Sequence, residues 1–297
     1  VNFTGTNLGQ QGNNSRIVFT SPIPTTNGGM IGAWAVADLT NYAAYNAGLG
    51  VGVVGQGGFV GYAGASGPGM LWQIPVTANT TTTLPAGTTH AAILRLAGAF
   101  TNDIAFTNAG DVLNLELGGL LRSNEAFNST IGTPAIRGVL TTGSGELIAY
   151  NNQNTLTINS VIQGSTRLVK DGASILTLTA PNTYTLGTVI NRGTTNISPT
   201  TAGDVVIPAG GLLINGGVTG GGPTVNLSTS NAIAASTVLT MRGASALTFA
   251  AGVSQTLDSI VFDSNGGTGG PTLTLTVTGT LTLTSGSPIV ATSSNAA

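Results

Sequence analysis

Paired carboxylates and basic side chains near acids are the residues of this chain best suited to chemistry. Asp103, Asp111 and Glu116 are the densest acids, and a glycosidase needs two carboxylates about 5–10 Å apart. A polysaccharide lyase needs a base such as Arg or Lys, and Arg167 and Lys170 stand beside Asp171. However, Asp111 and Glu116 have opposite strand parity, and the second group is typical of a charged turn. We therefore expect no enzyme, and the alternative is a β-helix polysaccharide-active enzyme.

Metal and nucleophile sites have few candidate residues. His90 is the only histidine and cysteine is absent, which excludes multi-histidine and thiolate sites. No nucleophile-elbow motif accompanies His90, so we interpret it as a solvated loop histidine. Residues 266–274 are close to a calcium-binding nonapeptide, but Pro271 stands where a carboxylate is needed. Asp263 and Asn265 are interpreted as Asx-turn residues. The sequence predicts no catalytic, metal or cofactor-binding residues.

One glycine motif matches a dinucleotide-binding pattern only formally. Residues 50–55 read GVGVVG, but phosphate binding requires a helix after the motif. The following segment, residues 56–61, is a poor helix former, and no acid appears before Asp103. A nucleotide site is not predicted.

The elements that must carry these residues are short strands separated by turns. Leu176-Thr177-Leu178-Thr179 alternates apolar and hydroxyl side chains, which is typical of a strand with two different faces. Pro181-Asn182 turns the chain, a second strand runs near residues 184–190, and residues 191–193 turn it again. Two such strands fit one coil of a β-solenoid, which needs stacked neighbours to bury its inward side chains.

An internal repeat supports this interpretation. The pattern that begins at Leu168 and contains Gly172 and Leu176 recurs from Leu239, through Gly243 and Leu247. The offset is 71 positions (239 minus 168), which is about three coils at the roughly 20–30 residues of a solenoid repeat.

The same stretch resembles a known family. Leu168-x-Lys170-x-Gly172, Leu176-Thr177-Leu178, Asn182-Thr183-Tyr184, Gly187-Thr188 and Ile190-Asn191-x-Gly193-Thr194 are similar to the autotransporter-associated β-strand repeat of bacterial surface proteins. Ser174 and Ala180-Pro181 depart from its glycine positions. The resemblance implies a right-handed parallel β-helix that is exported and has a structural or adhesive role.

Composition sets further limits. Only 6% of residues are charged and the formal net charge is −2, which leaves no basic patch for nucleic acid. Low charge, no cysteine and abundant Thr, Gly and Asn indicate an extracellular or bacterial cell-surface location. The chain begins at Val1 without a signal peptide, which we interpret as a processed or excised segment. Residues 43–62 carry no charge but are too rich in glycine for a membrane span.

The chain divides into two parts by composition. Residues 1–90 form a Gly/Thr-rich β region, either a cap or the start of the solenoid, and Trp34 is expected at the cap or in the core. Residues 33–45 favour a strand over a short helix, and the threonine run at 79–83 a loop or exposed strand. Residues 91–297 form the parallel β-helix, with the repeat at 166–197. Within it, Leu113, Leu115 and Leu117 should share the inner face, opposite Asn114 and Glu116.

The C-terminal end carries few of the charges that normally block an exposed solenoid edge. Either more coils follow in a longer protein, or another copy stacks on this end. At about 4.8 Å per coil, ten to twelve coils would give a rod roughly 50–60 Å long. We therefore predict a stalk, an adhesin scaffold or a filament-forming subunit that self-associates through its ends or edges. A carbohydrate-binding surface module remains a further alternative.

Overall fold

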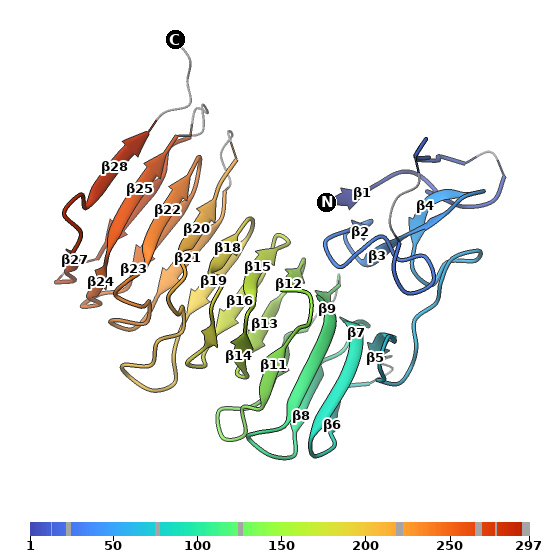
Figure 1. Cartoon of the computed structure of the whole chain (residues 1–297), viewed down its shortest axis with the longest axis horizontal. Helices are drawn as coiled ribbons and strands as arrows, with labels where there is room; N and C mark the ends of the chain where they lie inside the picture. The colour runs from blue at the N-terminus through green and yellow to red at the C-terminus, as the bar shows by residue number, and fades with distance from the viewer. Residues whose placement is uncertain are drawn as a thin grey trace, which may run out of the picture.

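The computed structural model describes residues 1–12, 14–21, 25–74, 78–123, 127–217, 222–264, 269–276 and 278–292. These residues form strands and turns and contain no helix. Parallel strands stack into a β-solenoid of about eight turns, with a separate group of strands beside its first turns (Figure 1). The predicted all-β parallel β-helix is confirmed, although it has fewer turns than the expected ten to twelve. Its right-handedness stays a prediction.

Each turn of the solenoid passes through three sides in a fixed order. The first side is a nine-stranded parallel sheet. Its strands are β6 (Thr80–Leu84), β8 (Asn102–Phe106), β10 (Ser129–Ile131), β13 (Thr155–Ile158), β16 (Ile175–Leu178), β19 (Thr194–Ile197), β21 (Thr224–Leu227), β23 (Ala246–Phe249) and β26 (Thr272–Leu275).

A short third side connects this sheet to the other long side, and the ten strands of that long side together with three strands of the short side form a thirteen-stranded sheet. The strands of the long side are β5 (Leu71–Ile74), β7 (Thr88–Leu96), β9 (Val112–Arg122), β12 (Glu146–Asn151), β15 (Arg167–Asp171), β18 (Thr188–Ile190), β20 (Leu212–Asn215), β22 (Val238–Arg242), β25 (Ser259–Asp263) and β28 (Ile289–Thr292). The short side contains β11 (Val139–Thr141), β14 (Val161–Gly164), β17 (Thr183–Tyr184), β24 (Gln255–Leu257) and β27 (Leu281–Leu283).

The strand register explains the internal repeat. Leu168 pairs with Thr188, which pairs with Leu212, which pairs with Leu239. On the nine-stranded sheet, Leu176 reaches Leu247 in the same number of steps. The repeated segments therefore lie three turns apart, as the 71-residue offset predicts.

The core is one continuous apolar column along the solenoid. Its buried residues begin at Trp72 and Ile74 in β5 and continue through every later turn to Leu257 and Ile260. Leu176 and Leu178 have no exposed surface, whereas Thr177 between them is half-buried. The apolar side chains of the alternating pattern thus fill the interior and Thr177 faces outward, whereas Thr179 after the strand is buried and donates to Asn159 Oδ1 at 2.7 Å.

An irregularity in β7 and β9 changes the face on which their side chains lie. The pairing of these two strands shifts register between Ala91 and Ile93. Leu113 and Leu115 lie in the core as predicted, whereas Leu117 packs against a second apolar cluster outside it. The prediction that all three leucines share the inner face was therefore wrong for Leu117, because a bulge breaks the two-residue period.

The N-terminal unit consists of β1 (Asn2–Phe3), β2 (Val36–Ala37), β3 (Asn41–Asn46) and β4 (Gly50–Val53). Residues 33–45 contribute strands and not a helix, as predicted, and the threonine run lies largely in β6. Tyr42 and other buried residues of this unit pack against outward side chains of the solenoid, among them Ile93, Leu121 and Ile148. The expected boundary between positions 90 and 91 falls within β7, and the parallel stacking of the solenoid already begins at β5.

The two ends of the solenoid differ in apolar exposure. Trp72 in the first turn is 4% exposed, whereas Ile289 in the last turn is 61% exposed. All four residues of β28 are exposed, and Leu275 of β26 is as well. The last described turn therefore presents an apolar surface that no later described turn covers.

Candidate functional site

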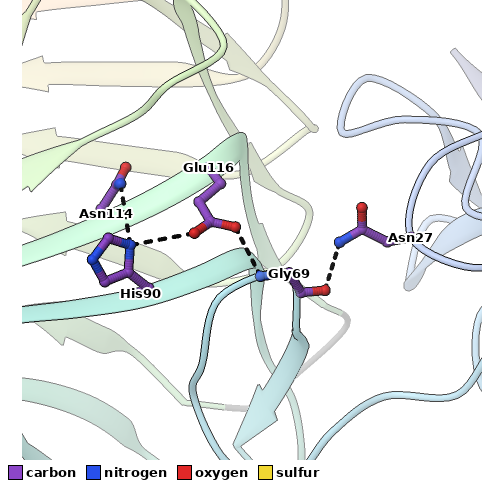
Figure 2. Close-up of polar contacts among 5 residues, drawn as sticks. All are labelled: Asn27, Gly69, His90, Asn114 and Glu116. Atoms are coloured by element: carbon purple, nitrogen blue, oxygen red, sulfur yellow. Dashed lines mark hydrogen bonds and ion pairs between the residues drawn. The ribbon is translucent and has the colours of Figure 1, made fainter.

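His90 lies in a small polar cluster on the outside of β7 and β9 (Figure 2). Its Nδ1 atom lies 3.2 Å from Glu116 Oε1 and 3.5 Å from Asn114 Nδ2. The side chains of His90 and Glu116 are 39% and 31% exposed. The loop assignment of His90 was wrong, because the residue sits within a strand, but the expected shared face of Asn114 and Glu116 is confirmed.

Glu116 connects this cluster to the segment between the N-terminal unit and the solenoid. The backbone N–H of Gly69 donates to Glu116 Oε2 at 2.8 Å, and Asn27 Nδ2 donates to the Gly69 carbonyl at 2.5 Å (Figure 2). The second carboxylate oxygen is thus used to hold a backbone segment. The geometry supports a tether between the two parts of the chain. His90 Nδ1 makes one hydrogen bond at a time, because it must carry a proton to donate to Glu116 and must lack one to accept from Asn114.

The three acids singled out in the sequence hold three different backbone segments. Asp103 Oδ1 accepts from the Thr130 N–H at 2.6 Å, and Glu116 holds Gly69. Asp111 accepts from the N–H groups of Gly87 at 2.8 Å and Asn108 at 2.6 Å. These donors lower the pKa of Asp111, with the Gly87 bond the largest cause. Each of these hydrogen bonds places the carboxylate in a structural role.

The group Arg167, Lys170 and Asp171 is not a turn cluster, because all three residues belong to β15. Strand alternation separates them: Arg167 faces outward and pairs with Glu146 at 3.3 Å, whereas Lys170 is fully buried. Lys170 Nζ donates to the carbonyls of Asp171 at 2.8 Å, Gly172 at 2.7 Å and Arg192 at 3.1 Å. Three acceptors match the three N–H groups of an ammonium, so this lysine bridges the corners of two successive turns.

The two glycine motifs behave as connecting structure where they are described. Residues 50–53 form β4, which pairs antiparallel with β3, and a turn follows it in place of a helix. Residues 265–268, which comprise Asn265 and the first three residues of the calcium-like segment, lie outside the described part of the chain. Asp263 forms an ion pair with Arg242 at 3.4 Å, which the Asx-turn interpretation did not anticipate. The residues that the structure describes contain no group of three His, Asp or Glu placed to hold a metal ion.

A groove of about 260 Å³ lies where the N-terminal unit meets the outer face of β12, β15 and β18. We name it the Trp34 groove; its lining includes Trp34, Glu146, Ile148, Tyr150, Arg167 and Asp171. Trp34 is 50% exposed, which excludes the core, one of its two expected places; a place in a cap stays a prediction. Sequence reasoning missed this groove because its residues come from segments more than a hundred positions apart. The sequence does carry one signal for the groove: strand alternation predicts that every second residue of β12 and β15 faces outward, and these outward residues line it.

Comparison of the chain with models of protein families, with curated proteins and with solved structures finds no match. The resemblance to the autotransporter-associated repeat therefore stays a prediction. The described residues form no helix that is long and apolar enough to cross a membrane.

Proposed function

We propose that this chain is a non-catalytic structural segment of an extracellular or bacterial cell-surface protein. It would serve as a stalk, an adhesin scaffold or a filament-forming subunit. The single observation that supports this proposal best is the uninterrupted apolar core that joins the turns of the solenoid. A column of this kind holds an elongated shape passively, because each turn completes the hydrophobic interior of its neighbours.

The chemistry of the surface supports an environment outside the cell. Only 6% of the residues are charged, and outward positions of the stacked strands carry Thr and Asn side chains instead. Asn215 Nδ2, for example, donates to Asn191 Oδ1 at 2.9 Å, and Asn226 Nδ2 donates to Asn196 Oδ1 at 3.0 Å. Such neutral ladders depend little on salt, since they contain no ion pairs to screen.

The proposed partner is a further layer of strands on the C-terminal end. Ile289 and Val290 of β28 and Leu275 of β26 are exposed together in the last described turn. Strand edges with apolar side chains are templates for pairing with another chain. A second copy or a further coil of a longer protein would cover these groups.

Electron microscopy and sedimentation of the purified chain test this proposal. We expect rods whose association increases with concentration, and Ile289→Lys should abolish the association. Val18→Lys is the matched control, because Val18 is 58% exposed in the N-terminal unit. Compact particles would contradict the stalk, and association unchanged by Ile289→Lys would contradict the end contact. Release of reducing sugars from polysaccharides would favour an enzyme instead.

A further inference from the structure

The Trp34 groove has an apolar floor that continues from the interface with the N-terminal unit. Ile148, Val169 and Val189 follow one another in register on the outer face of β12, β15 and β18. The N-terminal unit covers Ile148, which is 9% exposed, and leaves Val169 and Val189 half-buried. The floor is therefore partly open to a ligand that approaches beside the N-terminal unit.

Trp34 supplies an aromatic surface at this groove. It is one of the few large apolar side chains of the N-terminal unit that remain exposed, at 50%. Most of the other aromatic surface of the unit is covered: Tyr42, for example, has no exposed surface. An indole combines a large apolar face with an N–H donor, which suits a ligand with an apolar face and polar edges.

Tyr150 provides an independent sign that the groove is made for a polar ligand. The residue is 5% exposed and lines the groove, yet its buried hydroxyl has no hydrogen-bond partner among the described residues. Leaving such a group unpaired costs about 1–3 kcal/mol. Burial raises the pKa of Tyr150 to about 12, with Asp171 adding to the effect. The hydroxyl therefore keeps its proton at neutral pH and can donate it to a ligand oxygen.

Polar groups stand on both sides of the apolar floor. Within β12, Glu146 and Tyr150 lie two positions before and after Ile148, and they pair with Arg167 and Asp171 of β15. The ion pair of Glu146 and Arg167 thus lies on one side, at 3.3 Å. Tyr150 and Asp171 lie on the other side. This arrangement places hydrogen-bonding groups around an apolar centre.

We propose that the Trp34 groove binds a neutral glycan. A pyranose ring has an apolar C–H face, which would stack on Trp34 or the valine floor, and a rim of hydroxyls, which would bond to Tyr150, Asp171 and Glu146. The lining holds two acids, Glu146 and Asp171, against two positive groups, Arg167 and the Val1 ammonium, so the groove has no net positive charge that would attract a polyanionic glycan. A volume of about 260 Å³ is slightly below that of pockets for drug-sized ligands, and it suits one or two sugar units.

A second groove extends the proposed site along the solenoid. It has a volume of about 350 Å³, shares Arg167 and Val189 with the first and continues over Leu213 and Val238. Successive sugars of one chain would lie across successive turns of the thirteen-stranded sheet. A peptide fits this face less well, because the backbone groups of these strands are already paired with neighbouring strands and main-chain pairing is blocked.

Glycan-array screening followed by calorimetry with the bound oligosaccharides tests the proposal on the whole chain. We expect the wild-type chain to bind neutral oligosaccharides and not polyuronates. Trp34→Ala should weaken binding at least tenfold, and Tyr150→Phe should weaken it about five- to tenfold through the lost hydrogen bond. Phe127→Ala is the control, because Phe127 is an aromatic residue of similar exposure, 44%, outside the groove; binding should not change.

Three outcomes would overturn the proposal. The first is the absence of any neutral glycan signal, and the second is unchanged affinity in Trp34→Ala. The third is a peptide ligand from a displayed library whose binding requires Trp34. Circular dichroism melting of each variant separates loss of the site from loss of folding. The scaffold proposal is tested separately from these results, since rod shape and end association are measured without any glycan.

Discussion

Lys170 is the single lysine of the chain and is fully buried in a column of otherwise apolar side chains. Its register neighbours are Ala149 and Ile190. Burial lowers the pKa of Lys170 from 10.5 to about 7, and Arg192 contributes in the same direction while Asp171 opposes it. Nζ of Lys170 donates hydrogen bonds to the carbonyls of Asp171, Gly172 and Arg192, and these bonds hold the side chain in place.

This pKa predicts how stability depends on pH. Between about pH 7 and 10.5 the unfolded chain binds a proton at Lys170 that the folded chain has released. The free energy of unfolding should therefore rise with pH across this window. Below it, Lys170 is protonated in both states, and the full cost of burying its charge lowers the stability of the folded chain. Urea unfolding at pH 6 to 9 measures the slope. Lys170→Met should remove the lysine contribution, and an equal slope in that variant would contradict the assignment.

The inward and outward positions of β16 give a second prediction at the scale of single residues. Leu178 is fully buried in the core and Thr177 beside it faces outward. Leu178→Ala should lower the free energy of unfolding by about 2–5 kcal/mol, and Thr177→Ala by less than about 1 kcal/mol. Leu176→Asp or Leu178→Asp should prevent folding. Native circular dichroism and an unchanged melting temperature in the Asp variants would show that the inward assignment is wrong.

At the scale of elements, the corners of the coil depend on glycines that let successive turns approach closely. Gly172 follows β15 with a φ of +83°. A Cβ atom at this position would lie 2.2 Å from the carbonyl oxygen of Asn151 in the preceding turn. Gly193, one turn later, is similar: its φ is +69° and a Cβ would lie 2.4 Å from the Ser174 oxygen. Glycine is therefore needed at these positions for two reasons: the backbone is left-handed there, and a Cβ atom would collide with the neighbouring turn.

The two contributions can be separated with a pair of alanine variants. Gly203 has a φ of +91°, but no atom of another part of the chain lies within 4 Å of the position that a Cβ would occupy. Gly203→Ala should therefore cost only about 1–2 kcal/mol of backbone strain. Gly172→Ala should cost at least about 2 kcal/mol more, because two turns must separate. Chemical denaturation measures both values. Equal losses in the two variants would mean that stacking distance does not depend on Gly172.

At the scale of the whole molecule, the solenoid is covered at one end and open at the other. The N-terminal unit packs on the outside of the first turns, and Glu116 fixes the connecting segment through Gly69. The last turn, with β26, β27 and β28, has neighbours on one side only within the described chain. Stability should therefore decrease along the axis toward the C-terminal end.

Hydrogen exchange measured by mass spectrometry tests this gradient. Amides of β15 and β18 should exchange slowest, because turns cover them on both sides, and amides of β28 should exchange fastest. Raising the protein concentration should slow exchange in β28 if copies associate through this end. Uniform protection along the chain at low concentration would contradict the gradient.

The sequence by itself determined the solenoid, because local alternation and a repeated spacing are properties of neighbouring residues. Alternation in Leu176-Thr177-Leu178 specified the buried face, and the 71-residue offset specified three turns. It also indicated that Asn114 and Glu116 share a face. These features follow from the two-residue period of a strand.

Only the tertiary structure decided which distant residues meet. The bulge in β7 and β9 moved Leu117 out of the core, and stacking drew Lys170 into a buried corner with carbonyls from the next turn. The Trp34 groove likewise joins residue 34 to strands near positions 146 and 167. Such contacts depend on how turns and units pack in space, and the order of residues within one strand carries no information about them.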